Sequence, residues 1–127
     1  MLVDARNVMR SRWPNLREDR FVALTRLWAE REGVDLLVVF DGRAPGGVVG
    51  TAELDERTAL VGTGGESADD WIVREAARLA GAGRRVRLVS SDRELRDRAS
   101  SHVERTVGGG AFATLLESVE REGSTET

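Results

Sequence analysis

The sequence contains no cysteine, which excludes disulfide bonds, thiolate metal sites and cysteine nucleophiles. A chain without cysteine is compatible with a reducing compartment. No apolar run approaches the roughly 18 residues needed to cross a bilayer. The first residues, MLVDARNV, are too short and too acidic for a signal peptide. We therefore expect a cytoplasmic protein that has no membrane-spanning segment.

Lysine is absent as well, because all 19 basic residues are arginine. A P-loop needs a lysine to contact the phosphates, so GTGGE at 62–66 is interpreted as an ordinary glycine-rich loop. Response-regulator receivers and haloacid-dehalogenase-type phosphatases place a lysine near their aspartates, which disfavours both. Histidine occurs once, as His102, and no second ligand or triad partner stands at a suitable spacing. Ser90 and Ser91 lack a general base for serine hydrolysis.

The net charge of the 127 residues is −3, so no positive field covers the whole surface. Any binding of a polyanion must depend on local groups of arginines. With 40% apolar residues the chain is long enough for one domain with its own core.

Apolar segments of two kinds alternate along the chain. Five segments read as strands, namely 1–4, 34–42, 58–62, 85–92 and 103–108. Helical periodicity is expected between about 15 and 33, over 66–80, over 92–100 and around Phe112, Leu115, Leu116 and Val119. Within the glycine-rich stretch 42–66, TALVG is the only strand candidate. The alternation predicts an α/β fold with a mostly parallel sheet and helices on both faces.

Aspartates stand at the ends of three expected strands, as Asp4, Asp41 and Asp92, and Asp69 and Asp70 begin the helix after Ser67. Local structure accounts for part of this pattern, since Ser67 and Asp70 form a capping box. In parallel sheets, however, ligands bind beyond the carboxyl ends of the strands. If Asp4, Asp69, Asp70 and Asp92 converge there, two charges at about 4 Å repel by roughly 4 kcal/mol at an effective dielectric constant of 20. Such a group favours Mg²⁺ or Mn²⁺ and the hydrolysis of phosphodiester bonds.

Four motifs, in this order, resemble the NYN domain, a branch of the PIN-like metal-dependent nucleases, and in particular its bacterial YacP-type members. They are VDARNV (3–8), VVFDG (38–42), SADDWIV (67–73) and VSSDREL (89–95), and the resemblance covers residues 1–120. It implies a three-layer α/β/α sandwich with a mostly parallel central sheet, in which the five expected strands lie in the order 3-2-1-4-5. The domain is expected to occupy residues 1–122, and 123–127 are expected to form a frayed tail.

The resemblance also implies roles for single residues. Asp4, Asp92 and the pair Asp69 and Asp70 are the residues that hold Mg²⁺ or Mn²⁺ for RNA cleavage in that family. We favour Asp69 as the ligand and keep Asp70 as a second ligand or a base that positions water. Asn7 is expected to hydrogen-bond across the site. Asp41 matches an acid often found after the second strand, although a turn aspartate before glycine explains it equally well.

The first motif departs from the family, because Ala5 and Arg6 replace a glycine and an aromatic residue that many relatives have. Contacts to RNA are expected from arginine forks and hydroxyls near the acids. The candidates are Arg6, Arg10, Arg12, Arg43, Arg93, Arg96, Ser90 and Ser91, and Trp13 could stack an unpaired base. Structural roles for these arginines, serines and Trp13 stay open.

The leading hypothesis is thus a metal-dependent endoribonuclease. The alternatives are a catalytically weak RNA-binding domain of the same fold and a flap-type DNA nuclease. The chain leaves little room for an added RNA-binding module, so protein partners could supply RNA specificity. Its oligomeric state is left open.

Overall fold

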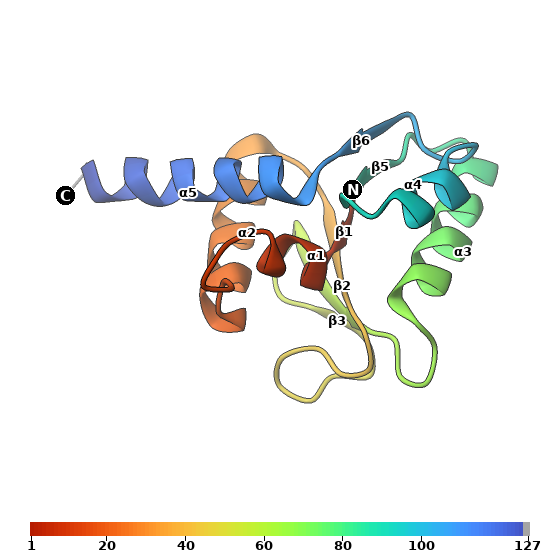
Figure 1. Cartoon of the computed structure of the whole chain (residues 1–127), viewed down its shortest axis with the longest axis horizontal. Coiled ribbons are helices and arrows are strands. Elements are labelled where there is room, and N and C mark those ends of the chain that lie inside the picture. Colours follow the sequence, from red (N-terminus) through yellow and green to blue (C-terminus); the bar gives the residue numbers. More distant parts are fainter. Residues whose placement is uncertain (126–127) are drawn as a thin grey trace.

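The computed structural model describes the backbone of residues 1–125 and the side chains of residues 1–122. The elements follow the order β1 (Leu2–Asp4), α1 (Ala5–Arg10), α2 (Glu18–Glu32), β2 (Leu36–Phe40), β3 (Gly50–Glu53), β4 (Thr58–Gly62), α3 (Ala68–Gly81), β5 (Arg87–Val89), α4 (Arg93–Ala99), β6 (Arg105–Val107) and α5 (Gly109–Thr125). Figure 1 shows the sheet between two groups of helices, with α5 extending to one side.

The strands form one sheet in the order β3-β4-β2-β1-β5-β6, in which only β3 is antiparallel to its neighbour. The five strands expected from the sequence correspond to β1, β2, β4, β5 and β6. Their order in space confirms the arrangement 3-2-1-4-5 and the α/β/α fold. Because β1 lies in the middle of the sheet, its carboxyl end is flanked by those of β2 and β5.

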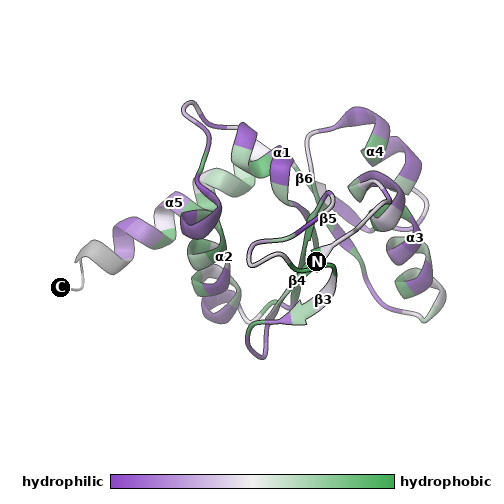
Figure 2. Cartoon of the chain, turned by 90° about the horizontal axis from the view of Figure 1, so that it is seen from below, coloured by the Kyte–Doolittle hydropathy of each residue, from purple (hydrophilic) through white to green (hydrophobic). Residues whose placement is uncertain are grey.

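Side chains that alternate along the strands create two apolar layers. Val3 and Val38 face the helices α1, α2 and α5, whereas the neighbouring Leu2 and Val39 face α3 and α4. This alternation follows from the two-residue period of a strand. Figure 2 shows hydrophobic residues concentrated along the strands and the inner sides of the helices. Both faces of the sheet are therefore covered.

The helices begin and end largely where local signals place them. Ser67 is the N-cap of α3 and its hydroxyl accepts the Asp70 N–H at 3.1 Å, as the capping-box pattern predicts. Gly33 ends α2 in the left-handed conformation, with φ of 65°. Leu27, expected on the apolar face of α2, is 54% exposed because Phe21, Leu24 and Trp28 form that face.

Two elements were not anticipated. The six-residue helix α1 follows β1 directly, and its N-cap, Asp4, makes no side-chain capping bond. Strand β3 is mostly exposed and is defined by its pairing with β4. Its presence corrects the expectation that TALVG is the only strand within 42–66. Neither segment has a strong local pattern, so packing and pairing create them.

The loop between β2 and β3 folds tightly onto β4 at Gly62. A Cβ atom at this position would lie 1.9 Å from the Val48 carbonyl oxygen, so only glycine fits. At the other end of the chain, α5 continues to Thr125, and the rest of the tail expected to fray, residues 126–127, lies outside the described residues. No helix in the described part of the chain is long and apolar enough to cross a membrane.

Candidate metal and RNA site

Asp4 is the central acid of the candidate site. It ends the middle strand β1 and is only 8% exposed. Burial is the main reason that the pKa of its carboxyl group rises to about 6, and the negative charges of Asp69 and Asp41 raise it further. Hydrogen bonds from the Ser90 hydroxyl and from the Asn7 backbone N–H act in the opposite direction. The structure thus holds an acid where ionisation is unfavourable.

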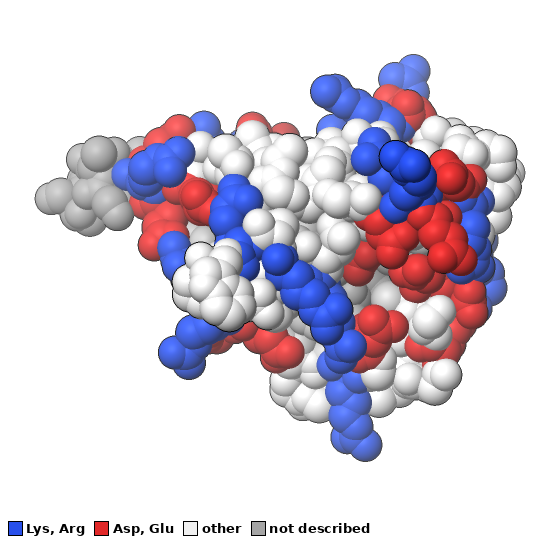
Figure 3. All heavy atoms as spheres, viewed as in Figure 1, with Lys and Arg blue, Asp and Glu red and all other residues white. Residues whose placement is uncertain are grey.

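Three further acids border Asp4 from separate elements. Asp41 follows β2, Asp69 lies in the first turn of α3, and Asp92 is the N-cap of α4 just after β5. The pKa of Asp69 is raised, first by partial burial and then by the charges of Asp92 and Asp41. The acids predicted at the strand ends therefore lie near enough to one another, and to Asp69, to influence one another's pKa. Figure 3 shows acidic side chains gathered over α3 and α4 on this face.

Asp70 has a different environment from its neighbour Asp69. Its carboxylate accepts a hydrogen bond from the Arg98 guanidinium at 2.7 Å and is exposed. This bond is the main reason that the pKa of Asp70 is lowered. Adjacent residues of a helix point about 100° apart, so Asp69 faces the other acids while Asp70 faces α4. Sequence reasoning did not single out Arg98, because its partner lies 28 residues away on another helix.

Asp41 also has a structural role. Its Oδ1 atom accepts the Ala68 N–H at 2.6 Å and so satisfies a donor in the first turn of α3. The Arg6 guanidinium lies 3.8 Å from the Asp41 carboxylate and 3.4 Å from its carbonyl oxygen. Arg6 therefore places a half-exposed positive charge against the acidic group.

Ser90 connects two of the acids. Its hydroxyl donates to Asp4 Oδ2 at 3.0 Å and accepts the Asp92 N–H at 3.1 Å. The residue is fully buried, so its hydroxyl is engaged inside the protein instead of being presented to a substrate. Asp92 in turn accepts the Leu95 N–H at 3.1 Å and caps α4.

Asn7 joins α1 to the loop that carries Asp92. Its Oδ1 atom accepts the Ser91 N–H at 2.8 Å, and the Ser91 hydroxyl accepts the Gly109 N–H at 2.8 Å. The asparagine thus hydrogen-bonds to a residue 84 positions away in the sequence. A Cβ atom on Gly109 would lie 2.2 Å from Asn7 Oδ1, which explains a glycine at the start of α5.

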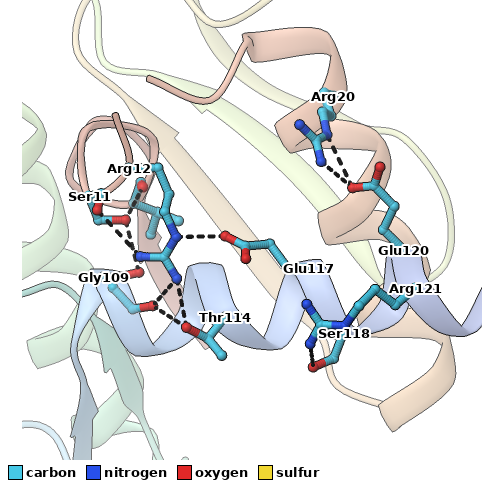
Figure 4. Close-up of polar contacts among 11 residues, drawn as sticks. Ser11, Arg12, Arg20, Gly109, Thr114, Glu117, Ser118, Glu120 and Arg121 are labelled. Atoms are coloured by element: carbon cyan, nitrogen blue, oxygen red, sulfur yellow. Dashed lines mark hydrogen bonds and ion pairs between the residues drawn. The ribbon is translucent and has the colours of Figure 1, made fainter. Parts of the chain in front are cut away.

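The candidate arginines divide into two groups. Arg12 contacts Glu117 and Thr114 on α5, each at 2.6 Å, as Figure 4 shows, and Arg96 donates to Thr106 at 2.7 Å. These two arginines, together with Arg6 beside Asp41, are engaged within the protein. The others, Arg10, Arg43 and Arg93, are exposed and have no ion pair or hydrogen bond within the described residues. A hollow of about 340 Å³ beside the site brings together Ser91, Arg93 and Arg96.

The donor atoms of the site are all oxygens, which suits Mg²⁺ or Mn²⁺. Within the described residues, no three histidine, cysteine, aspartate or glutamate side chains are close enough together to enclose a metal ion directly. The chemistry of the donor set fits a hard dication, but the carboxylates as they stand are too far apart for direct chelation by three of them.

Residues 1–126 match the family model for the YacP-like NYN domain. The crystal structure of Rae1 (YacP) from Bacillus subtilis is similar, with a TM-score of 0.69 and 20% sequence identity, over 98% of this chain and 77% of that one. Its W164L mutant has a TM-score of 0.66 and 21% identity, over 95% of this chain and 76% of that one. No curated protein matches the sequence. At these identities the two structures support the fold, whereas the family match extends over nearly the whole chain. The chain therefore belongs to the YacP-like NYN domain family, within the PIN-like nucleases.

Proposed function

We propose that this protein is a metal-dependent endoribonuclease that cleaves RNA at the carboxyl edge of its sheet. The observation that carries the proposal is the mutual effect of acids from four separate segments. Asp69 and Asp41 raise the pKa of Asp4, and Asp92 and Asp41 raise the pKa of Asp69. Negative charges held together in this way are stabilised by a cation. Family membership supports a hydrolase acting on nucleic acid.

Asp4, Asp69 and Asp92 are the residues that would hold Mg²⁺ or Mn²⁺. A bound ion of this kind lowers the pKa of a water molecule and neutralises charge on the phosphate and the leaving oxygen. Ser90 orients the Asp4 carboxylate, and Asn7 holds the loop before Asp92. The pairing of Asp70 with Arg98 suits a role in fixing α3 against α4, so we assign the ligand role to Asp69.

Arginines at the same edge are suited to hold the RNA. Arg6 lies beside Asp41, and Arg93 begins the helix that Asp92 caps. A guanidinium donates two parallel hydrogen bonds to phosphate oxygens, so these residues can orient the backbone near the acids. Because the net charge is −3, binding depends on such local groups and not on the overall charge.

The test is cleavage of end-labelled RNA with Mg²⁺ or Mn²⁺. We expect cleavage to disappear with EDTA and in the variants Asp4→Asn and Asp92→Asn. Asp35→Asn is the matched control, because this exposed acid pairs with Arg57 at the amino edge of the sheet. Cleavage that persists in both site variants would refute the assignment. Competition with DNA of the same sequence separates a ribonuclease from a flap-type DNA nuclease.

A second candidate function is RNA binding without turnover. It is favoured by one observation, that no three potential ligands among the described residues are close enough to enclose a metal ion. Retained RNA binding with no cleavage in either metal would identify this function. Protein partners that supply RNA specificity would then be identified by whether they change which RNA the domain binds.

A further inference from the structure

Trp13 is the most exposed large apolar side chain among the residues whose side chains the structure describes. Its exposed fraction is 94%, whereas Trp28 is only 7% exposed and Trp71 is half-buried. Tryptophan normally buries a large apolar area, so a ring left in solvent gives up a substantial stabilising contribution. The folded core does not use this ring.

The loop around Trp13 is nevertheless held firmly on both sides. On one side, Arg12 binds Glu117 and Thr114 of α5 (Figure 4). On the other side, Leu16 is buried and its N–H donates to the Met9 carbonyl oxygen at 3.0 Å. The exposure of Trp13 therefore arises from a fixed backbone that directs the ring outward. A ligand that stacks on the ring therefore orders a side chain without also having to order the loop that carries it.

Arginines connect this ring to the acidic group. Arg6 and Arg10 are four residues apart on α1, so they lie on the same side of that helix, about 6 Å apart along its axis. Arg10 and Arg43, which follows β2, are both exposed, and neither has a partner within the described residues. Figure 3 shows a band of arginine side chains that crosses this face beside the acidic group. A polyanion that lies across α1 would contact the positive charges of these arginines.

Helix α1 joins the two ends of this surface along the chain. It begins directly after Asp4 and ends three residues before Trp13. Its six residues rise about 9 Å, which two or three stacked nucleotides span at about 3.4 Å each. The length of α1 thus corresponds to two or three nucleotides of one strand.

We propose that Trp13 and Arg10 form a platform for unpaired RNA, on which a base of the strand to be cleaved stacks. The proposal rests on the proposed function for the location of that bond. Stacking needs a free base face, which a duplex does not offer, and the Arg10 fork binds a phosphate of the same strand. The substrate class is therefore single-stranded RNA.

The test measures binding without cleavage. A fluorescein-labelled oligouridylate is titrated in EDTA and followed by anisotropy. Trp13→Ala is expected to weaken binding about tenfold or more. Arg10→Ala is expected to weaken it several-fold and to reduce the slope of log K against log salt by about 0.7. The same RNA annealed to its complement is expected to bind equally to wild type and Trp13→Ala.

Two control variants remove side chains of the same kinds, one apolar and one arginine, at positions away from this surface. Leu27→Ala removes another exposed apolar side chain, and Arg105→Ala removes an exposed arginine at the amino end of β6 that has no partner among the described residues. Both are expected to bind single-stranded RNA within about twofold of wild type. Because the Trp13 ring is exposed and Arg10 has no ion pair or hydrogen bond within the described residues, their variants are expected to unfold at the wild-type temperature.

The outcomes separate this proposal from the ribonuclease assignment. If wild type cleaves RNA but Trp13→Ala binds oligouridylate as well as Leu27→Ala does, the platform is refuted and the ribonuclease stands. If wild type does not cleave RNA but Trp13→Ala and Arg10→Ala bind single-stranded RNA more weakly than the control variants do, the platform stands without the cleavage. A change in sedimentation of Trp13→Ala with unchanged RNA binding would assign the ring to a protein contact and refute the proposal.

Discussion

Burial favours the neutral form of Asp4, whereas the proposed binding of a cation requires its charged form. Its carboxyl pKa of about 6 in the folded state compares with an ordinary value of 3.8 for an aspartate in water. Between these values the folded protein holds a proton that the unfolded chain has released. Stability therefore falls as the pH rises from about 4 through 6 and stays low above that range.

Replacing Asp4 by asparagine removes this penalty. We expect Asp4→Asn to raise the free energy of unfolding above pH 6 by about 2 to 3 kcal/mol, because one pKa unit corresponds to about 1.4 kcal/mol. Near pH 3 the gain is expected to vanish, since Asp4 is then protonated in both states. Urea unfolding at both pH values, with Asp35→Asn as the control, measures the difference. An equal or lower stability of Asp4→Asn at pH 8 would contradict the proposed cost of its ionisation.

The helices α1 and α5 are joined beside the site. They meet where Gly109, Asn7 and Ser91 form a chain of hydrogen bonds, and Arg12 adds contacts to the first three turns of α5. These contacts also distinguish two of the arginines near Asp4. Arg12 fixes a helix and is not available to RNA, whereas Arg10, only two residues earlier, is exposed and unpartnered among the described residues.

Two adjacent glycines of α5 offer a sharp test of this junction. In Gly109→Ala the new methyl group meets Asn7 Oδ1 at 2.2 Å, so we expect a loss of at least about 2 kcal/mol of stability and reduced cleavage. In Gly110→Ala the methyl group meets only Arg12 Nη1 at 3.7 Å, and alanine favours the helix by up to about 1 kcal/mol. Thermal unfolding of both variants is the measurement. Equal effects of the two substitutions would show that the junction does not depend on this close approach.

At the scale of the whole molecule, the parallel sheet brings the acids together. The neighbours β2, β1 and β5 end at the same edge, so Asp41, Asp4 and Asp92 meet although they are far apart in the sequence. Helix α3 adds Asp69 from the face of the sheet that it covers. Such a group stores electrostatic repulsion that a cation relieves only in the folded state.

Mg²⁺ or Mn²⁺ is therefore expected to stabilise the folded protein. At a concentration 100 times the dissociation constant the gain is about 2.7 kcal/mol, which raises the melting temperature by several degrees. The effect is expected to be lost with EDTA and in Asp4→Asn and Asp69→Asn, but to persist in Asp35→Asn. Differential scanning calorimetry at pH 7.5 is the measurement. An unchanged melting temperature of wild type in either metal would argue against a metal site at this edge.

Much of the fold could be predicted from local patterns. The buried runs, Ser67 at the head of α3 and Gly33 at the end of α2 were visible in the sequence, and the motif resemblance supplied the strand order. Helix α1 and strand β3 were not visible. The first is too short for a helical period, and the second is an exposed strand stabilised by its pairing with β4.

By itself the sequence determined the alternation of elements, the placement of acids at strand ends and the motifs of the family, because these depend on local spacing. Only the tertiary structure decided which of two adjacent acids faces the site and which arginines are engaged within the protein. It separates Asp69 from Asp70 and Arg10 from Arg12. The physical reason is that a side chain's partner is set by what packs against it in space, and those partners stand many residues away in the sequence.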